Sequence, residues 1–91
     1  MALQLKPNRD IEKSVTDLPP KHFRQIMLKV LKLLNDPYPN DVKKITLNAV
    51  EYLRADIGEY RIIYKVDNEV LYLVLIDKRN DDTVYKALKR K

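Results

Sequence analysis

The sequence predicts an α+β fold in which two N-terminal helices pack on a four-stranded, mainly antiparallel sheet, followed by a short C-terminal helix. Two observations predict this class. Apolar residues at helical spacing are confined to the N-terminal part of the chain, and segments rich in β-forming residues follow a proline-containing loop. The chain has 91 residues, of which 45% are hydrophobic and one is glycine. This length suffices for one domain over residues 1–91 but not for two.

The N-terminal part is expected to form an extended segment and a short helix. Residues 2–6 end at Pro7, whose fixed φ and missing N–H donor suit an edge strand or a strand end. Asn8 is the expected N-cap of the helix, because its side chain can accept from a free backbone N–H. The apolar stripe of this helix consists of Ile11, Val15 and Leu18. The pair Pro19-Pro20 stops the helix.

A second helix is expected to begin near Pro20 and to continue to about residue 34. Its predicted core stripe consists of Phe23, Met27, Val30 and Leu34. Ile26, Leu31 and Leu33 widen this stripe, and Leu28 adds further apolar surface to the same helix. Residues 35–41 contain two prolines and four Asn or Asp residues, which predicts a loop by turn chemistry.

The remaining elements are expected to be strands and one closing helix. Residues 52–56 alternate, residues 60–66 are rich in β-formers, and residues 70–76 are continuously apolar, as in a central strand. We place two-residue turns at Ile57-Gly58 and Asp67-Asn68, because Gly and Asn tolerate a positive φ. Asp81-Asp82 would cap the closing helix.

Composition favours an anionic partner and excludes several kinds of site. The chain carries 18 Lys and Arg against 13 Asp and Glu, a formal charge of +5 that favours nucleic acid or an acidic protein segment. Solubility alone is the alternative explanation. No cysteine is present, and His22 and Ser14 are single residues of their types without partners for metal binding or nucleophilic catalysis. With no glycine-rich loop either, we expect no metal and no cofactor.

A soluble, cytoplasmic protein without membrane contact is expected. Residues 1–7 lack the apolar core of a signal peptide, and the longest apolar run, residues 70–76, is too short to span a bilayer.

Two arginines are the first candidates for chemistry. With the turn at Ile57-Gly58, Arg54 would lie directly opposite Arg61, where like charges destabilise a sheet. An anion bound across the pair would explain this arrangement, because a guanidinium matches phosphate geometry and stays charged. Neutralisation of each arginine by a neighbouring carboxylate such as Asp56 is an equally weighted alternative.

Further cations follow the last strand. Continued alternation from Val70 would align Lys78 with the two arginines, and Arg79 would reach them only if the strand ends or bulges near Asp77. Tyr85 could stack on a base, although packing is the commoner role of a helical tyrosine.

These residues resemble a known family. Residues 52–64, with the sequence YLRADIGEYRIIY, resemble the central hairpin of RelE-type toxins of the RelE/ParE superfamily. The turn at residues 67–70 and the segment KRNDDTVY at residues 78–85 resemble the corresponding elements of the same family. The order of two helices, a proline-containing loop and a sheet is also similar. The resemblance covers nearly the whole chain.

The resemblance implies a toxin of a type II toxin–antitoxin system that cleaves messenger RNA in the ribosomal A site. In this family the ribose 2′-OH attacks the adjacent phosphate, and basic side chains replace the usual histidines. Arg54 matches the position near the 2′-OH, and Arg61 matches the phosphate-stabilising arginine. Arg79 matches the arginine beside the leaving oxygen, and Tyr85 matches the base-stacking tyrosine. Further RNA contacts are expected from Lys43, Lys44 and Lys78.

Partners and alternatives follow from the same resemblance. We expect a RelB-like antitoxin that covers Leu28 and Leu31, the ribosome with its messenger, and operator DNA only through the antitoxin. Asp56 departs from the family, because many relatives carry a basic residue there. Two alternatives therefore stay open: a ParE-like inhibitor of DNA gyrase without nuclease activity, and a degenerate scaffold that only binds its antitoxin.

Overall fold

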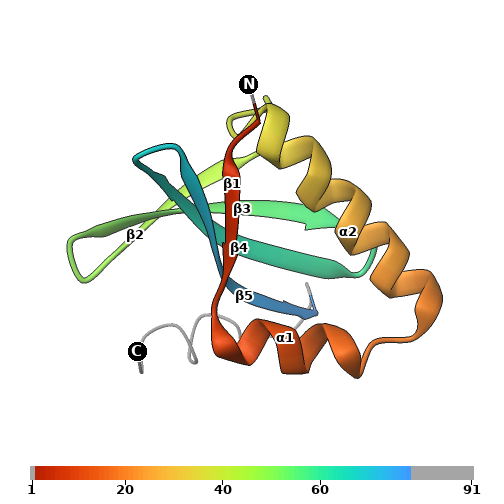
Figure 1. The fold of residues 1–91 in the computed structure, drawn as a ribbon. Coiled ribbons are helices and arrows are strands. Elements are labelled where there is room, and N and C mark those ends of the chain that lie inside the picture. Colours follow the sequence, from red (N-terminus) through yellow and green to blue (C-terminus); the bar gives the residue numbers. More distant parts are fainter. Residues whose placement is uncertain (1, 79–91) are drawn as a thin grey trace.

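Two helices cover one face of a five-stranded mixed sheet in the computed structural model, which describes residues 2–78 (Figure 1). The elements in chain order are β1 (Gln4–Pro7), α1 (Arg9–Thr16), α2 (Pro20–Asn35), β2 (Lys43–Leu47), β3 (Val50–Ile57), β4 (Tyr60–Asp67) and β5 (Val70–Lys78). The strand order is β1-β5-β4-β3-β2. β1 pairs with β5 in parallel, and the other neighbours pair antiparallel.

The expectation of four strands is wrong, because β2 adds a fifth. β2 forms a hairpin with β3 through Asn48 and Ala49, which have φ values of 53° and 65°. Alanine rarely adopts this left-handed backbone, so the sequence carried no clear turn signal here. The expected closing helix from Asp81-Asp82 lies outside the described residues.

The starts of both helices and the Asn8 cap confirm the prediction. The side chain of Asn8 accepts from the backbone N–H of Asp10 at 2.7 Å, and α2 begins at Pro20. The core line of α2, however, runs through Ile26, Val30 and Leu33. Of the predicted stripe only Val30 is fully buried, and Phe23 is 42% exposed. The buried line therefore follows the side of the stripe that Ile26 and Leu33 were predicted to add, and it presents the residues at i, i+4 and i+7 from Ile26 to the sheet.

One main core lies between the helices and the sheet. Residues from both helices and the three longest strands share it, including Ile11, Ile26, Ala55, Ile62 and Leu71. Successive strand residues point to opposite faces, so the residues between these positions lie on the face away from the helices. We call this second surface the open face. At its centre Ile63 is buried in a small apolar cluster with Ile45, Leu47, Tyr52, Val74 and Leu75.

The loop between α2 and β2 is fastened at two points. The hydroxyl of Tyr64 donates to the carbonyl oxygen of Pro37 at 2.6 Å. Burial raises the pKa of Tyr64 well above its ordinary value. Lys29 Nζ lies 3.1 Å from Asp41 Oδ2, and this hydrogen bond lowers the pKa of Asp41. The first contact ties the loop to β4, and the second ties it to α2.

The β3–β4 turn requires a positive φ at Gly58, which has a φ of 57°. A Cβ there would lie 3.1 Å from Gln25 Oε1, at the end of a side chain that can move. We therefore expect Gly58→Ala to reduce the free energy of unfolding by about 1 kcal/mol, mainly through backbone strain. Gly58→Asn should cost less, because asparagine tolerates this conformation. Urea unfolding of both variants tests this, and an alanine variant as stable as the native chain would contradict it.

Candidate nucleic-acid interface

The β3–β4 hairpin places Arg54 and Arg61 on the open face. Asp56 lies opposite Arg61, and Ile63 lies opposite Arg54. The predicted turn was therefore one residue too early, and the two arginines are diagonal neighbours instead of directly opposed. Their placement on one face is confirmed by the register, because Leu53 and Ala55, which alternate with Arg54, are buried in the main core.

Asp56 lies between the two guanidinium groups. Its Oδ1 atom accepts from Arg61 Nε at 3.2 Å and lies 3.9 Å from Arg54 Nε. The side chains of Arg54 and Arg61 are 19% and 14% exposed, and that of Asp56 is 29% exposed. The cluster is thus partly shielded from water, which strengthens its electrostatic interactions. One carboxylate relieves the repulsion between the arginines and orients Arg61 through a hydrogen bond.

The bulge in β5 decides which later residues share the open face. Leu73 pairs with Tyr64 and Leu75 pairs with Ile63, so Val74 is the extra residue. As a result Asp77 lies opposite Arg61 on the open face. Lys78 pairs with Tyr60, which belongs to the main core, so Lys78 lies on the other face. The alternation argument that favoured Lys78 is therefore wrong. Arg79 and Tyr85 lie outside the described residues.

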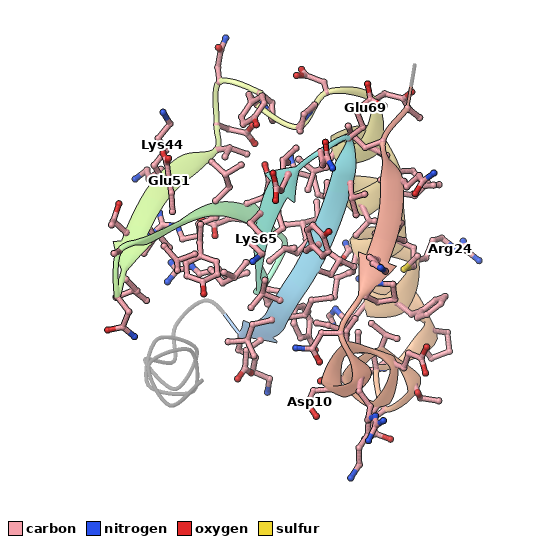
Figure 2. The ribbon with its side chains drawn as sticks, turned by 60° about the vertical axis from the view of Figure 1, so that its left-hand side comes forward. Asp10, Arg24, Lys44, Glu51, Lys65 and Glu69 are labelled. Atoms are coloured by element: carbon pink, nitrogen blue, oxygen red, sulfur yellow. The ribbon has the colours of Figure 1, made fainter. Side chains whose placement is uncertain are left out.

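The two predicted lysines of β2 separate onto different faces. Lys43 pairs with Arg54 and joins the open face, where it is exposed. Lys44 pairs with Leu53 on the other face and lies 3.5 Å from Glu51 in a surface ion pair (Figure 2). The structure therefore brings Lys43 to the arginine cluster and directs Lys44 away from it.

Sequence reasoning missed two cations of the open face. The first is Lys65, which lies on the side of the sheet turned away from the helices (Figure 2). The second is Lys6 of β1, which pairs with Tyr72 on this open face. Arg24, by contrast, projects from the outer side of α2 (Figure 2). The alternation of β4 from Arg61 through Ile63 to Lys65 was a signal that could have identified Lys65.

Other kinds of site are not found in residues 2–78. This part of the chain contains no group of three or more His, Cys, Asp or Glu side chains that could hold a metal ion. Within it, no helix is both long and apolar enough to cross a membrane. The candidate site on the open face consists of the cations Lys43, Arg54 and Arg61 with the carboxylates Asp56 and Asp77 beside them.

The charge of Asp56 offers a direct test of the site. We expect Asp56→Asn to bind single-stranded RNA about fivefold more tightly at low salt, because a charge that repels phosphate is removed. The asparagine oxygen can still accept from Arg61 and hold it in place. The matched control is Glu12→Gln, which makes the same charge change at an exposed position of α1, on the helix side of the sheet. Fluorescence anisotropy measures both, and equal affinities for the two variants would contradict the placement of RNA on this face.

Comparison with known proteins agrees with this architecture. No protein-family model matches the chain, and no curated protein sequence matches it significantly. Among solved structures, a chain of the archaeal RelE–RelB complex from Pyrococcus horikoshii OT3 is similar with a TM-score of 0.76 and 27% identity. The match covers 88% of this chain and 98% of that chain.

Two further structures show the same likeness. A mutant of the E. coli toxin RelE in the free state has a TM-score of 0.68 and 25% identity, covering 99% of this chain and 98% of that one. The Mycobacterium tuberculosis RelBE2 toxin–antitoxin complex has a TM-score of 0.75 at 18% identity, covering 89% and 95%. Two helices on a five-stranded mixed sheet therefore define the RelE-like α+β class. The predicted resemblance to RelE toxins is confirmed, and the chain is RelE-like.

Proposed function

We propose that the chain is the toxin of a type II toxin–antitoxin system and acts as a ribosome-dependent endoribonuclease on messenger RNA in the A site. One observation carries the proposal: Arg54 and Arg61 converge on Asp56 at the open face, where an RNA strand can approach. The similarity to the E. coli toxin RelE and to RelE–RelB complexes supports it.

Cleavage in this proposal is an internal transfer at one phosphate. The ribose 2′-oxygen forms a bond to phosphorus while the bond to the 5′-oxygen of the next nucleotide breaks. The 2′-hydroxyl loses its proton and the leaving oxygen gains one, which yields a cyclic phosphate and a 5′-hydroxyl. Negative charge builds on the phosphoryl oxygens in the transition state, and the Arg61 guanidinium stabilises it without a metal ion.

Arg54 has a different role in the same step. A guanidinium group stays protonated near neutral pH, so Arg54 cannot accept the 2′-hydroxyl proton. We assign it to orienting and polarising the 2′-hydroxyl. Arg79 beside the leaving oxygen and Tyr85 beneath a base complete the proposed site by resemblance. Lys43 would contact the RNA backbone from the neighbouring strand.

An antitoxin is the proposed protein partner. Leu28 and Leu31 of α2 are 54% and 53% exposed, so the main core does not use them. They lie three residues apart and form part of one helix face, which suits an amphipathic segment of a partner. Acidic residues of that partner would then meet the basic open face. A stable chain that binds no protein encoded beside it would contradict this part of the proposal.

Cell-free translation with the purified chain tests the proposal. Primer extension should map cuts inside translated codons, and these cuts should be absent with Arg61→Ala and with Arg79→Ala. Intact messenger with undiminished translation would contradict it. Inhibition of DNA gyrase would then be measured, since a ParE-like inhibitor is the alternative function.

A further inference from the structure

A row of alternating aromatic and basic side chains crosses the open face beside the arginine cluster. Lys65 of β4 pairs with Tyr72 of β5, and Tyr72 pairs with Lys6 of β1. On the other side, β3 and β4 are antiparallel and Leu53 pairs with Tyr64, so Tyr52, one residue before Leu53, lies opposite Lys65, one residue after Tyr64. The sheet therefore places Tyr52, Lys65, Tyr72 and Lys6 across four neighbouring strands.

A pocket of about 390 Å³ lies over this row. All four side chains line it, together with Pro7 and Val74. Lys65 Nζ lies 5.5 Å from the centre of the Tyr72 ring, so the cation already interacts with an aromatic face. Both tyrosines and Lys65 are half-buried, whereas Lys6 is exposed. The pocket thus combines partly preorganised rings with positive charge.

The chemistry of the pocket fits one nucleotide. Flat aromatic rings stack on any nucleobase, and lysine ammonium groups bind phosphate as point charges. The volume lies within the range of small-ligand pockets. Tyr52 lies two residues from Arg54 on the same face of β3, a spacing of about 7 Å along a strand. The pocket is therefore adjacent to the arginine cluster on the open face.

We infer that this Tyr/Lys pocket binds a nucleotide of single-stranded RNA that flanks the phosphate held at Arg54 and Arg61. The base stacks on a tyrosine ring, and Lys65 and Lys6 neutralise the adjoining phosphate. The inference rests on the proposed function for the identity of the RNA. It adds a binding subsite across β3, β4, β5 and β1 that the arginine cluster does not supply.

Binding of a short RNA with a 2′-O-methyl group on every ribose tests the inference without cleavage. The chain has six tyrosines and no tryptophan, so stacking is expected to quench its tyrosine emission directly. Fluorescence anisotropy gives the affinity. Tyr72→Ala should weaken binding about tenfold, whereas Tyr72→Phe, which keeps the ring, should bind within about twofold of the native chain. Tyr38→Ala removes a tyrosine that is 60% exposed in the α2–β2 loop and serves as the matched control.

The charge contribution has a separate readout. Lys65→Gln should reduce the slope of log affinity against log salt by about 0.7, as expected for one lost phosphate contact on a single strand. Lys44→Gln, on the other face, should leave the slope unchanged. An unchanged slope for Lys65→Gln would place the phosphate elsewhere and overturn the inference.

The outcomes separate this inference from the proposed function. Loss of RNA binding in Tyr72→Ala but not in Tyr38→Ala supports the pocket, even if the chain cleaves no messenger. If Tyr72→Ala binds RNA as tightly as the native chain, the inference is overturned. Messenger cleavage by the native chain is measured separately and can still support the proposed function. Absence of RNA binding by the native chain also overturns it. Quenching by an acidic peptide but not by RNA would identify a protein-binding surface instead.

Discussion

Replacing Arg61 with alanine is expected to slow cleavage of ribosome-bound messenger by about 100- to 1,000-fold. The guanidinium is partly shielded and is held by Asp56 at 3.2 Å, so it is preorganised for charge that develops in the transition state. Loss of one such donor typically costs this much in rate. Single-turnover cleavage on programmed ribosomes measures the effect at saturating toxin.

Matched variants distinguish this role from simple charge. Arg61→Lys keeps the charge but loses the forked donor, so it should retain only part of the rate. Lys44→Ala removes a cation from the opposite face, where Lys44 pairs with Glu51, and should cleave at nearly the native rate. If Arg61→Ala and Lys44→Ala slow cleavage equally, net charge and not the arginine cluster governs the reaction.

Replacing Tyr64 with phenylalanine is expected to lower the free energy of unfolding by about 1–3 kcal/mol. The ring stays in the core, but the carbonyl oxygen of Pro37 loses the donor that approaches it at 2.6 Å. An unsatisfied polar group away from water costs this much. Tyr38→Phe in the same loop should change stability by less than about 0.5 kcal/mol, because Tyr38 is 60% exposed. Urea unfolding compares the two variants.

The same hydroxyl makes stability depend on alkaline pH. Burial raises the pKa of Tyr64 in the folded chain, whereas the unfolded chain ionises near pH 10. A raised folded pKa means that stability is fully present below about pH 10 and decreases as the pH rises further. The advantage of the native chain over Tyr64→Phe should therefore shrink above about pH 10. An advantage that is constant with pH would contradict the burial of this phenol.

The sequence predicted the elements better than their register. Helix boundaries were predictable because Asn8 and Pro20 act locally, through capping and a fixed φ. β2 was missed because its turn uses Ala49 in a conformation that alanine rarely adopts. A bulge at Val74 was also unpredictable, since it depends on pairing between β4 and β5. One extra residue there reversed the faces of Asp77 and Lys78.

The candidate site was predictable where alternation along one strand decides the face, and unpredictable where pairing between strands decides it. Arg54 and Arg61 share a face whenever the positions that alternate with them are buried, and the structure confirms that face. Their shared contact with Asp56 depends on a turn one residue later than expected. The row through Lys65 and Tyr72 joins strands that are distant in sequence from β1, so no local pattern could reveal it.

The most direct test of the account uses a messenger with a single 2′-deoxy nucleotide at the expected cleavage position in the A-site codon. The native chain should cut the all-ribose messenger on programmed ribosomes, leaving a cyclic phosphate and a 5′-hydroxyl. It should leave the 2′-deoxy messenger intact at that position, because the attacking oxygen is missing. Equal cutting of both messengers, or no cutting of either, would contradict the proposed 2′-hydroxyl attack at the arginine cluster.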